Sequence, residues 1–149
     1  MEAPHNNIWG PHLWMILHST AERIGLKGNP LEEKRIWIGL LSSLRYSLPC
    51  PQCKKHYSVY YLSHPVNGSN RDIRMWLYHL HSEVNNRNEK PSIEVEELEV
   101  YCNPFHFSYH YSFVVDHMNR ALRLGWSNRN DTQRTFRFLN ELKCFYDLF

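Results

Sequence analysis

The sequence has little of what marks a membrane-bound, repetitive or strongly charged protein. It has only six glycines, which argues against a repeat-rich β protein, and it contains no internal repeat or low-complexity tract. No apolar run approaches the ~20 residues that a membrane span needs. The formal net charge is only +2, so charge alone indicates neither a nucleic-acid nor a membrane partner.

The beginning of the chain also lacks the marks of a targeting segment. Residues 1–7 have neither the basic start and apolar stretch of a signal peptide nor the arginine-rich character of a transit peptide. We therefore expect the protein to stay in the cytoplasm, with no signal or transit peptide. A secreted disulfide scaffold becomes a weak explanation for its four cysteines, and their spacing matters more than their number.

Composition and periodicity predict one all-helical domain. The 149 residues are 42% hydrophobic, and the seven Phe, nine Tyr and five Trp suit a helical core or a planar cofactor. Apolar residues recur at helical spacing in six segments. These segments are residues 9–24, 30–46, 51–62, 72–90, 105–124 and 132–148. The fourth is the clearest, because Ile73, Leu77, Leu80 and Val84 form one continuous stripe.

A Cys-x-x-Cys pair, Cys50 and Cys53, lies where the third helix begins, with Pro51 well placed as its first residue. Unsatisfied backbone N–H groups and the helix dipole favour a thiolate there, so the pair looks reactive. Cys53, His56 and Tyr60 share one helical face. A zinc site stays open, because these cysteines and His56 need only one more ligand, such as His81. A small disulfide loop is also open, whereas a thioredoxin-like pair lacks its βαβ context.

The fourth helix carries a polar ledge beside its apolar stripe. His81, Asn85 and Tyr78 fall on one flank of that stripe, and His79 points nearly opposite. Taken alone, such a ledge is more often structural than ligand-binding.

Three motifs occur in a fixed order along the chain. They are residues 9–18 (WGPHLWMILH), 49–57 (PCPQCKKHY) and 76–85 (WLYHLHSEVN), the last followed by Lys90-Pro91. In this order and at this separation they closely resemble the Erv/Alr family of FAD-linked sulfhydryl oxidases, over roughly residues 8–91. The likeness is greatest to the short members from large DNA viruses.

The resemblance implies a four-helix bundle that holds FAD, with additional C-terminal helices. It implies that Cys50 and Cys53 form the redox disulfide, that Gly10, Trp14 and His18 contact the flavin nucleotide, and that His56 and Tyr60 line the flavin site with Cys53. It further implies that His81, Val84, Asn85 and Lys90 hold the adenine, ribose and phosphates. By this resemblance residues 1–92 form the oxidase core and residues 93–149 a helical extension packed on it.

The resemblance also implies the reaction and its partners. Electrons pass from protein thiols, directly or through a thioredoxin-like carrier, to the Cys-x-x-Cys, then to FAD and to molecular oxygen, giving hydrogen peroxide. A viral protein of this kind would act in the host cytoplasm or the virion. The alternatives are a zinc-binding helical interaction module that uses Cys50, Cys53 and His56, and a structural helical protein stapled by its cysteines.

Two further expectations concern association and the C-terminal third. Family members pair through their first two helices, and we expect a homodimer here because apolar residues lie on several sides of the second helix, at Ile36, Trp37, Ile38, Leu40 and Leu41. In the C-terminal third, Cys102, His106, His110 and His117 have the spacing of metal ligands, but we favour a structural role and predict no metal. Arginines among the aromatics there indicate a solvated face more than a nucleic-acid site. Three alternatives stay open for Cys102 and Cys144: they form a disulfide with each other, they relay electrons, or they remain free thiols.

Overall fold

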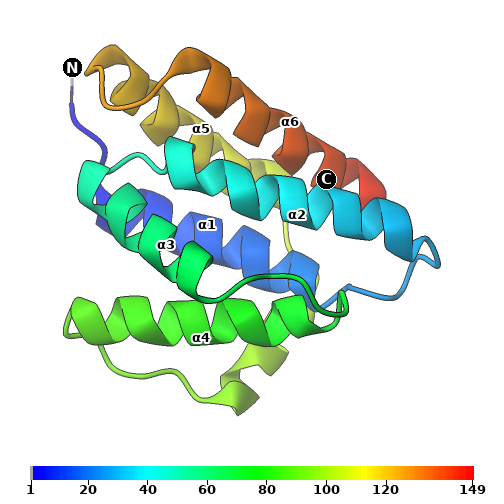
Figure 1. Cartoon of the computed structure of the whole chain (residues 1–149). Coiled ribbons are helices and arrows are strands. Elements are labelled where there is room, and N and C mark those ends of the chain that lie inside the picture. Colours follow the sequence, from blue (N-terminus) through cyan, green and yellow to red (C-terminus); the bar gives the residue numbers. More distant parts are fainter. Residues whose placement is uncertain (1) are drawn as a thin grey trace.

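The computed structural model describes residues 2–149, and that range contains helices and no strand (Figure 1). The helices are α1 (Asn6–Ala21), α2 (Pro30–Ser47), α3 (Pro51–Ser63), α4 (Asp72–Arg87), η1 (Val95–Cys102), α5 (Phe107–Arg123) and α6 (Arg129–Phe145). The all-α class and the six predicted helices are confirmed. The acidic stretch after Pro91, which the sequence pattern did not assign to a helix, forms the 3₁₀ helix η1.

Local sequence signals fix where two of these helices begin. In α2, Pro30 is at the first helical turn, and the Asn29 side chain accepts a hydrogen bond from the Glu32 N–H. In α3, Pro51 takes the same place and Cys50 is the N-cap, whose sulfur accepts from the Cys53 N–H. The Cys50–Cys53 pair is therefore held by a helix start that the sequence itself specifies.

The helices pack in layers around α1 and α2. α1 contacts α4, η1 and α5, whereas α2 contacts α3 and α6. In Figure 1, α4 and η1 lie on one side of α1 and α3, and α5 and α6 lie beyond α2 on the other side. One apolar core runs through the whole assembly, because buried residues of α5 and α6 belong to the same cluster as those of α1 and α2.

The C-terminal helix α6 is seated closely on α2. The Phe138 ring lies against Gly39, where a Cβ on the glycine would overlap the ring. Beside it, the buried Thr135 hydroxyl bonds the hydroxyls of Ser43 at 2.9 Å and Ser47 at 2.6 Å. Small residues on α2 therefore allow the close approach.

A buried polar network fixes the end of α6. The Tyr146 hydroxyl donates to the Glu33 carboxylate at 2.7 Å and accepts from the Trp37 indole N–H at 3.0 Å. Burial and the neighbouring carboxylate raise the pKa of Tyr146, so the phenol stays protonated. The C-terminal extension is thus tied to α2 by polar as well as apolar contacts.

This packing corrects the expected dimer surface. Ile36, Trp37, Leu40 and Leu41 are at most 2% exposed, and Ile38 is half-buried. The prediction that they supply an intermolecular surface is wrong, because α6 of the same chain packs on α2. A homodimer through this face would require α6 to leave.

The two remaining cysteines are free and exposed. Cys102 ends η1 and Cys144 lies on α6, and no disulfide joins them. Pairing, one of the alternatives above, is therefore not what the structure shows. None of the helices within residues 2–149 is long and apolar enough to cross a bilayer.

Candidate functional site

The chemical centre of the molecule is a disulfide at the start of α3. Cys50 and Cys53 are bonded to each other, with their Cα atoms 5.1 Å apart, and both residues are partly exposed. The Cys53 N–H donates to Cys50 Sγ at 3.2 Å. A thiolate formed here would face the N-terminal N–H groups and the positive end of the helix dipole.

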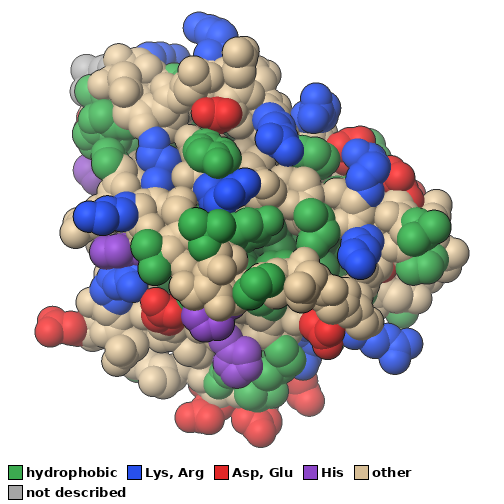
Figure 2. All heavy atoms as spheres, in the orientation of Figure 1, with side chains coloured by type: hydrophobic (Ala, Val, Ile, Leu, Met, Phe, Trp, Pro, Cys, Tyr) green, Lys and Arg blue, Asp and Glu red, His purple; other side chains and the backbone are tan. Residues whose placement is uncertain are grey.

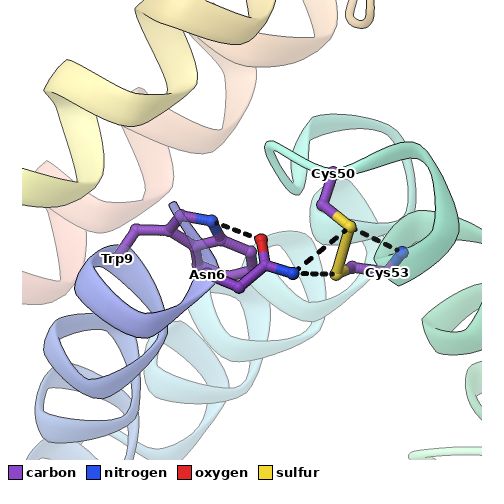
Figure 3. Close-up of a disulfide and its surroundings, with 4 residues drawn as sticks. All are labelled: Asn6, Trp9, Cys50 and Cys53. Atoms are coloured by element: carbon purple, nitrogen blue, oxygen red, sulfur yellow. Dashed lines mark hydrogen bonds between the residues drawn. A yellow bond between two sulfur atoms is a disulfide. The ribbon is translucent and has the colours of Figure 1, made fainter. Parts of the chain in front are cut away.

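The beginning of α1 approaches this disulfide from the opposite side. The Asn6 amide Nδ2 lies 3.5 Å from Cys53 Sγ and 3.7 Å from Cys50 Sγ. Its Oδ1 accepts from the Trp9 indole N–H at 3.0 Å (Figure 3). The disulfide at the start of α3 therefore also contacts α1, although Asn6 and Cys50 are 44 residues apart in sequence.

A cavity of about 1330 Å³ opens beside the disulfide, lined chiefly by residues of α1, α3 and α4. Ten of the eleven predicted site residues line it together: Gly10, Trp14, Cys50, Cys53, His56, Tyr60, His81, Val84, Asn85 and Lys90. A Cβ on Gly10 would meet no atom within 4 Å, so this glycine leaves open space at the cavity wall. The fold thus gathers the three sequence motifs around one space.

His18 is the exception, because it lies behind the cavity wall rather than in it. It is 2% exposed, and its Nε2 is 2.8 Å from Nδ1 of His81. Burial lowers the pKa of His18 to about 3 and that of His81 to about 4, so both rings are neutral at pH 7. One ring donates and the other accepts, which fixes the orientation of His81 at the wall.

Flat aromatic surfaces form one end of the cavity. The Trp14 and His81 rings stack at 4.0 Å between centroids and 4° between planes. On α3, two turns beyond Cys53, Tyr60 is buried and stacks on His64 at 4.1 Å, and burial raises its pKa to about 12. A planar ring system would find stacking partners at both positions.

The rest of the polar ledge on α4 divides between two tasks. Asn85 is buried at the cavity wall, where its Nδ2 donates to the Pro91 carbonyl and its own carbonyl accepts from the Lys90 N–H. Tyr78 instead donates to the Ile93 carbonyl at 2.8 Å and does not line the cavity. His79 is exposed, as its helical position predicts.

Cationic side chains stand at the mouth of the cavity. Arg87, the last residue of α4, and Lys90, just beyond it, line the cavity, and Arg87 forms an ion pair with Glu83 at 3.1 Å. Figure 2 shows Lys, Arg and His side chains along the left edge of the face, over the start of α3 and the end of α4. Stacking surfaces, cations and a disulfide on one cavity suit a planar cofactor that carries phosphates, as FAD does.

Three of the cavity residues that the sequence analysis did not predict come from outside the three motifs. Tyr101, from η1, stacks on His18 at 4.7 Å, and Trp126, from the turn between α5 and α6, reaches the cavity from the C-terminal extension. The Trp126 carbonyl accepts a hydrogen bond from Lys54, the residue after Cys53. No periodicity or motif marks these two aromatics. Asn6 could have been found, because its i, i+3 spacing to Trp9 places both on one helical face.

The zinc alternative has no ligand cluster in the described structure. Cys50 and Cys53 are bonded to each other, and residues 2–149 hold no group of three His, Cys, Asp or Glu side chains placed to bind a metal. In the C-terminal region His110 instead meets His12, with their Nδ1 atoms 2.9 Å apart. His106 caps α5 by accepting from the Tyr109 N–H.

Comparison with known proteins finds relatives across these elements. The profile of the Erv1/Alr family matches residues 11–103. The FAD-linked sulfhydryl oxidase of African swine fever virus (isolate Warthog/Namibia/Wart80/1980) is 34% identical over 93 residues, which cover 61% of this chain and 76% of that protein. The 088R protein of Frog virus 3 (isolate Goorha), whose name places it in the same class, is 30% identical over 96 residues, covering 60% and 62%.

A third relative, the 096R protein of Invertebrate iridescent virus 3, is 28% identical over 104 residues, covering 66% of this chain and 68% of that protein. No solved structure is significantly similar to the chain. α5 and α6 lie outside the residues that the family profile matches.

Proposed function

The chain belongs to the Erv1/Alr family and is a FAD-linked thiol oxidase, and we propose that its Cys50–Cys53 disulfide is the group that takes electrons from protein thiols. One observation carries this proposal. The disulfide lies on the same cavity as the stacked Trp14 and His81 and the cationic Lys90.

The cavity residues fit FAD by their chemistry. We assign the flat surfaces of Trp14 and His81, backed by His18, to the adenine end, and Lys90 with Val84 and Asn85 to the ribose and phosphates. Cys53, His56 and Tyr60, with open space at Gly10, would face the flavin ring. When bound there, FAD supplies a two-electron acceptor that is reoxidised by molecular oxygen with release of hydrogen peroxide.

The protein's own chemistry is disulfide exchange. A substrate thiolate attacks Cys50 Sγ, a mixed disulfide forms, the Cys50–Cys53 bond breaks, and the electron pair stays on Cys53 as a thiolate. A second substrate thiolate then attacks the mixed disulfide, so that the substrate leaves oxidised and Cys50 leaves as a thiolate. The two thiolates left, Cys50 and Cys53, form the disulfide again when two electrons leave them, and FAD held beside Cys53 by the cavity residues would be the acceptor of those electrons. We assign His56 a packing role at this site and no role as a base, because the exchange step itself transfers no proton once the attacking thiolate has formed.

Two further proposals concern the substrates and the association of the chain. We propose that protein thiols reach Cys50 directly or through a thioredoxin-like carrier, in the host cytoplasm or virion of a large DNA virus.

The dimer implied by the resemblance would have to use a surface other than α2, because α6 already covers that helix. We therefore propose that a single chain is the working unit, with residues 93–149 packed as an extension on the 1–92 core.

The test is the absorption spectrum and oxygen consumption of the purified protein with dithiothreitol. We expect a yellow protein that consumes oxygen. Cys50→Ser and Cys53→Ser should both abolish turnover, and only Cys50→Ser should show a long-wavelength thiolate-to-flavin band, because it leaves Cys53 free. Cys144→Ser, an exposed free cysteine on α6, is the matched control and should turn over normally. A colourless protein that FAD cannot reconstitute, or one with stoichiometric zinc, would contradict the proposal.

A further inference from the structure

Asn6 contacts both sulfurs of the disulfide but lies outside the three sequence motifs. Asn6 is the first residue of α1 and is exposed to solvent, yet its side chain has a defined place. In Figure 3 it lies between the Trp9 indole and the disulfide, with dashed contacts to both. The amide Nδ2 is 3.5 Å from Cys53 Sγ and 3.7 Å from Cys50 Sγ.

Trp9 determines which end of the amide faces the sulfurs. An indole N–H can only donate, so it must meet the amide oxygen, and the distance between Trp9 Nε1 and Asn6 Oδ1 is 3.0 Å. The NH₂ group then points at the disulfide. Trp9 itself is held in the core with 6% exposure, so it is a rigid anchor for an otherwise exposed side chain.

The two sulfurs differ in the donors that they meet. Cys50 Sγ accepts from the Cys53 N–H at 3.2 Å as well as from Asn6. Within residues 2–149, Asn6 is the one hydrogen-bond donor to Cys53 Sγ. Lys54, the nearest cation in sequence, is bonded instead to the Trp126 carbonyl and to Ser127. The other titratable groups that line the same cavity are His5, His56, Tyr57, Tyr60, His81, Glu83, Arg87, Lys90 and Tyr101.

We propose that Asn6 is a catalytic residue of the disulfide exchange and that Trp9 is the positioning residue that aims its amide. The inference rests on the proposed function for the identity of the attacking thiol. As the substrate thiolate bonds to Cys50 Sγ and the Cys50–Cys53 bond breaks, the electron pair collects on Cys53 Sγ. The Asn6 N–H groups stabilise that charge in place, and no proton has to move.

Hydrogen bonding to the leaving sulfur speeds thiol–disulfide exchange, because a more stable thiolate is a better leaving group. A bond to a charged acceptor is stronger than one between neutral groups, so the contact gains strength as the charge develops. For an exposed donor we expect an effect of about tenfold, at the low end of the range for charged hydrogen bonds.

The experiment compares Asn6→Ala, Asn6→Asp and Trp9→Phe in the FAD-bound protein. One readout is the rate at which dithiothreitol reduces the Cys50–Cys53 disulfide without oxygen, followed by alkylation and mass spectrometry. The other is the pH midpoint of alkylation of the reduced cysteines. Neither readout uses oxygen consumption, so the proposed oxidase activity can fail while these measurements still report on Asn6.

Asn6→Ala should slow reduction about tenfold and raise the alkylation midpoint by about one pH unit. Asn6→Asp should shift both further, because a carboxylate keeps the bond to Trp9 but presents negative charge to the sulfurs. Trp9→Phe keeps the packing and frees the amide, so it should shift both in the same direction by less. Asn67→Asp, the same change on an exposed loop residue beyond the far end of α3, is the control and should move neither.

Unchanged reduction rates and alkylation midpoints in Asn6→Ala would overturn the proposal, whatever the oxidase activity. If Asn6→Ala lost FAD or stability, Trp9→Phe and Asn6→Asp would decide. A wild-type alkylation profile in both would also overturn it.

Discussion

The buried pair His18 and His81 predicts a specific loss of stability on mild acidification. His18 is 2% exposed, and burial, with the neighbouring His81 and Arg74, lowers its pKa to about 3. In the unfolded chain its pKa returns to about 6.5. At pH 5 His18 is therefore protonated in the unfolded state but neutral in the native state. Folding stability from this group is complete above pH 6.5 and falls as the pH drops below it.

The magnitude follows from the linkage relation. Each pH unit below about 6.5 removes about 1.4 kcal/mol per unmatched proton, so His18 removes about 2 kcal/mol between about pH 7.5 and pH 5. His81 acts in the same direction, since its pKa is lowered to about 4. Because it is partly exposed, we expect a smaller loss of stability from it. For a chain of this size 2 kcal/mol corresponds to a fall in melting temperature of about 4–8 °C.

The assay is denaturant unfolding of the wild type and His18→Gln at both pH values, at saturating FAD. Gln offers an amide near the position of the imidazole Nε2 but does not titrate. The wild type should lose about 2 kcal/mol more than the variant over this pH range. The other histidines with lowered pKa values, including His12, His110 and His117, titrate in both proteins and cancel in the comparison. Equal losses in the two proteins would refute the reasoning.

Three other predictions concern the C-terminal extension. Tyr146→Phe leaves the Glu33 carboxylate and the Trp37 N–H without their shared partner, and should lower the free energy of unfolding by about 1–3 kcal/mol, measured by denaturant titration; a change below about 0.5 kcal/mol would contradict the network. Cys102→Ser with Cys144→Ser should leave dithiothreitol turnover within about twofold of wild type, because both thiols are free and neither lines the cavity. Sedimentation at micromolar concentration should give the 18.0 kDa monomer, because α6 covers α2; a stable 36 kDa species, about twice that mass, would show another interface.

Much of the fold is local and was therefore readable in the sequence. Apolar spacing fixes each helix, because residues three and four apart share a face whatever packs on it. Pro51 and Cys50 fix the start of α3, because a proline lacks the N–H that the first turn leaves unpaired. The order and spacing of the three motifs indicated both the family and most of the cavity residues, since the motifs lie on α1, α3 and α4, which together form the cavity wall.

The sequence could not predict the contacts between segments that are far apart along the chain. Burial of His18 behind His81, the stacking of Tyr101, and the approach of Trp126 to Lys54 depend on how η1 and the α5–α6 turn return to the core. The apolar face of α2 has the same pattern whether a second chain or α6 covers it, because hydrophobic burial does not distinguish an internal partner from an external one. Tertiary structure settled that choice through Gly39, whose missing side chain admits the Phe138 ring of the same chain.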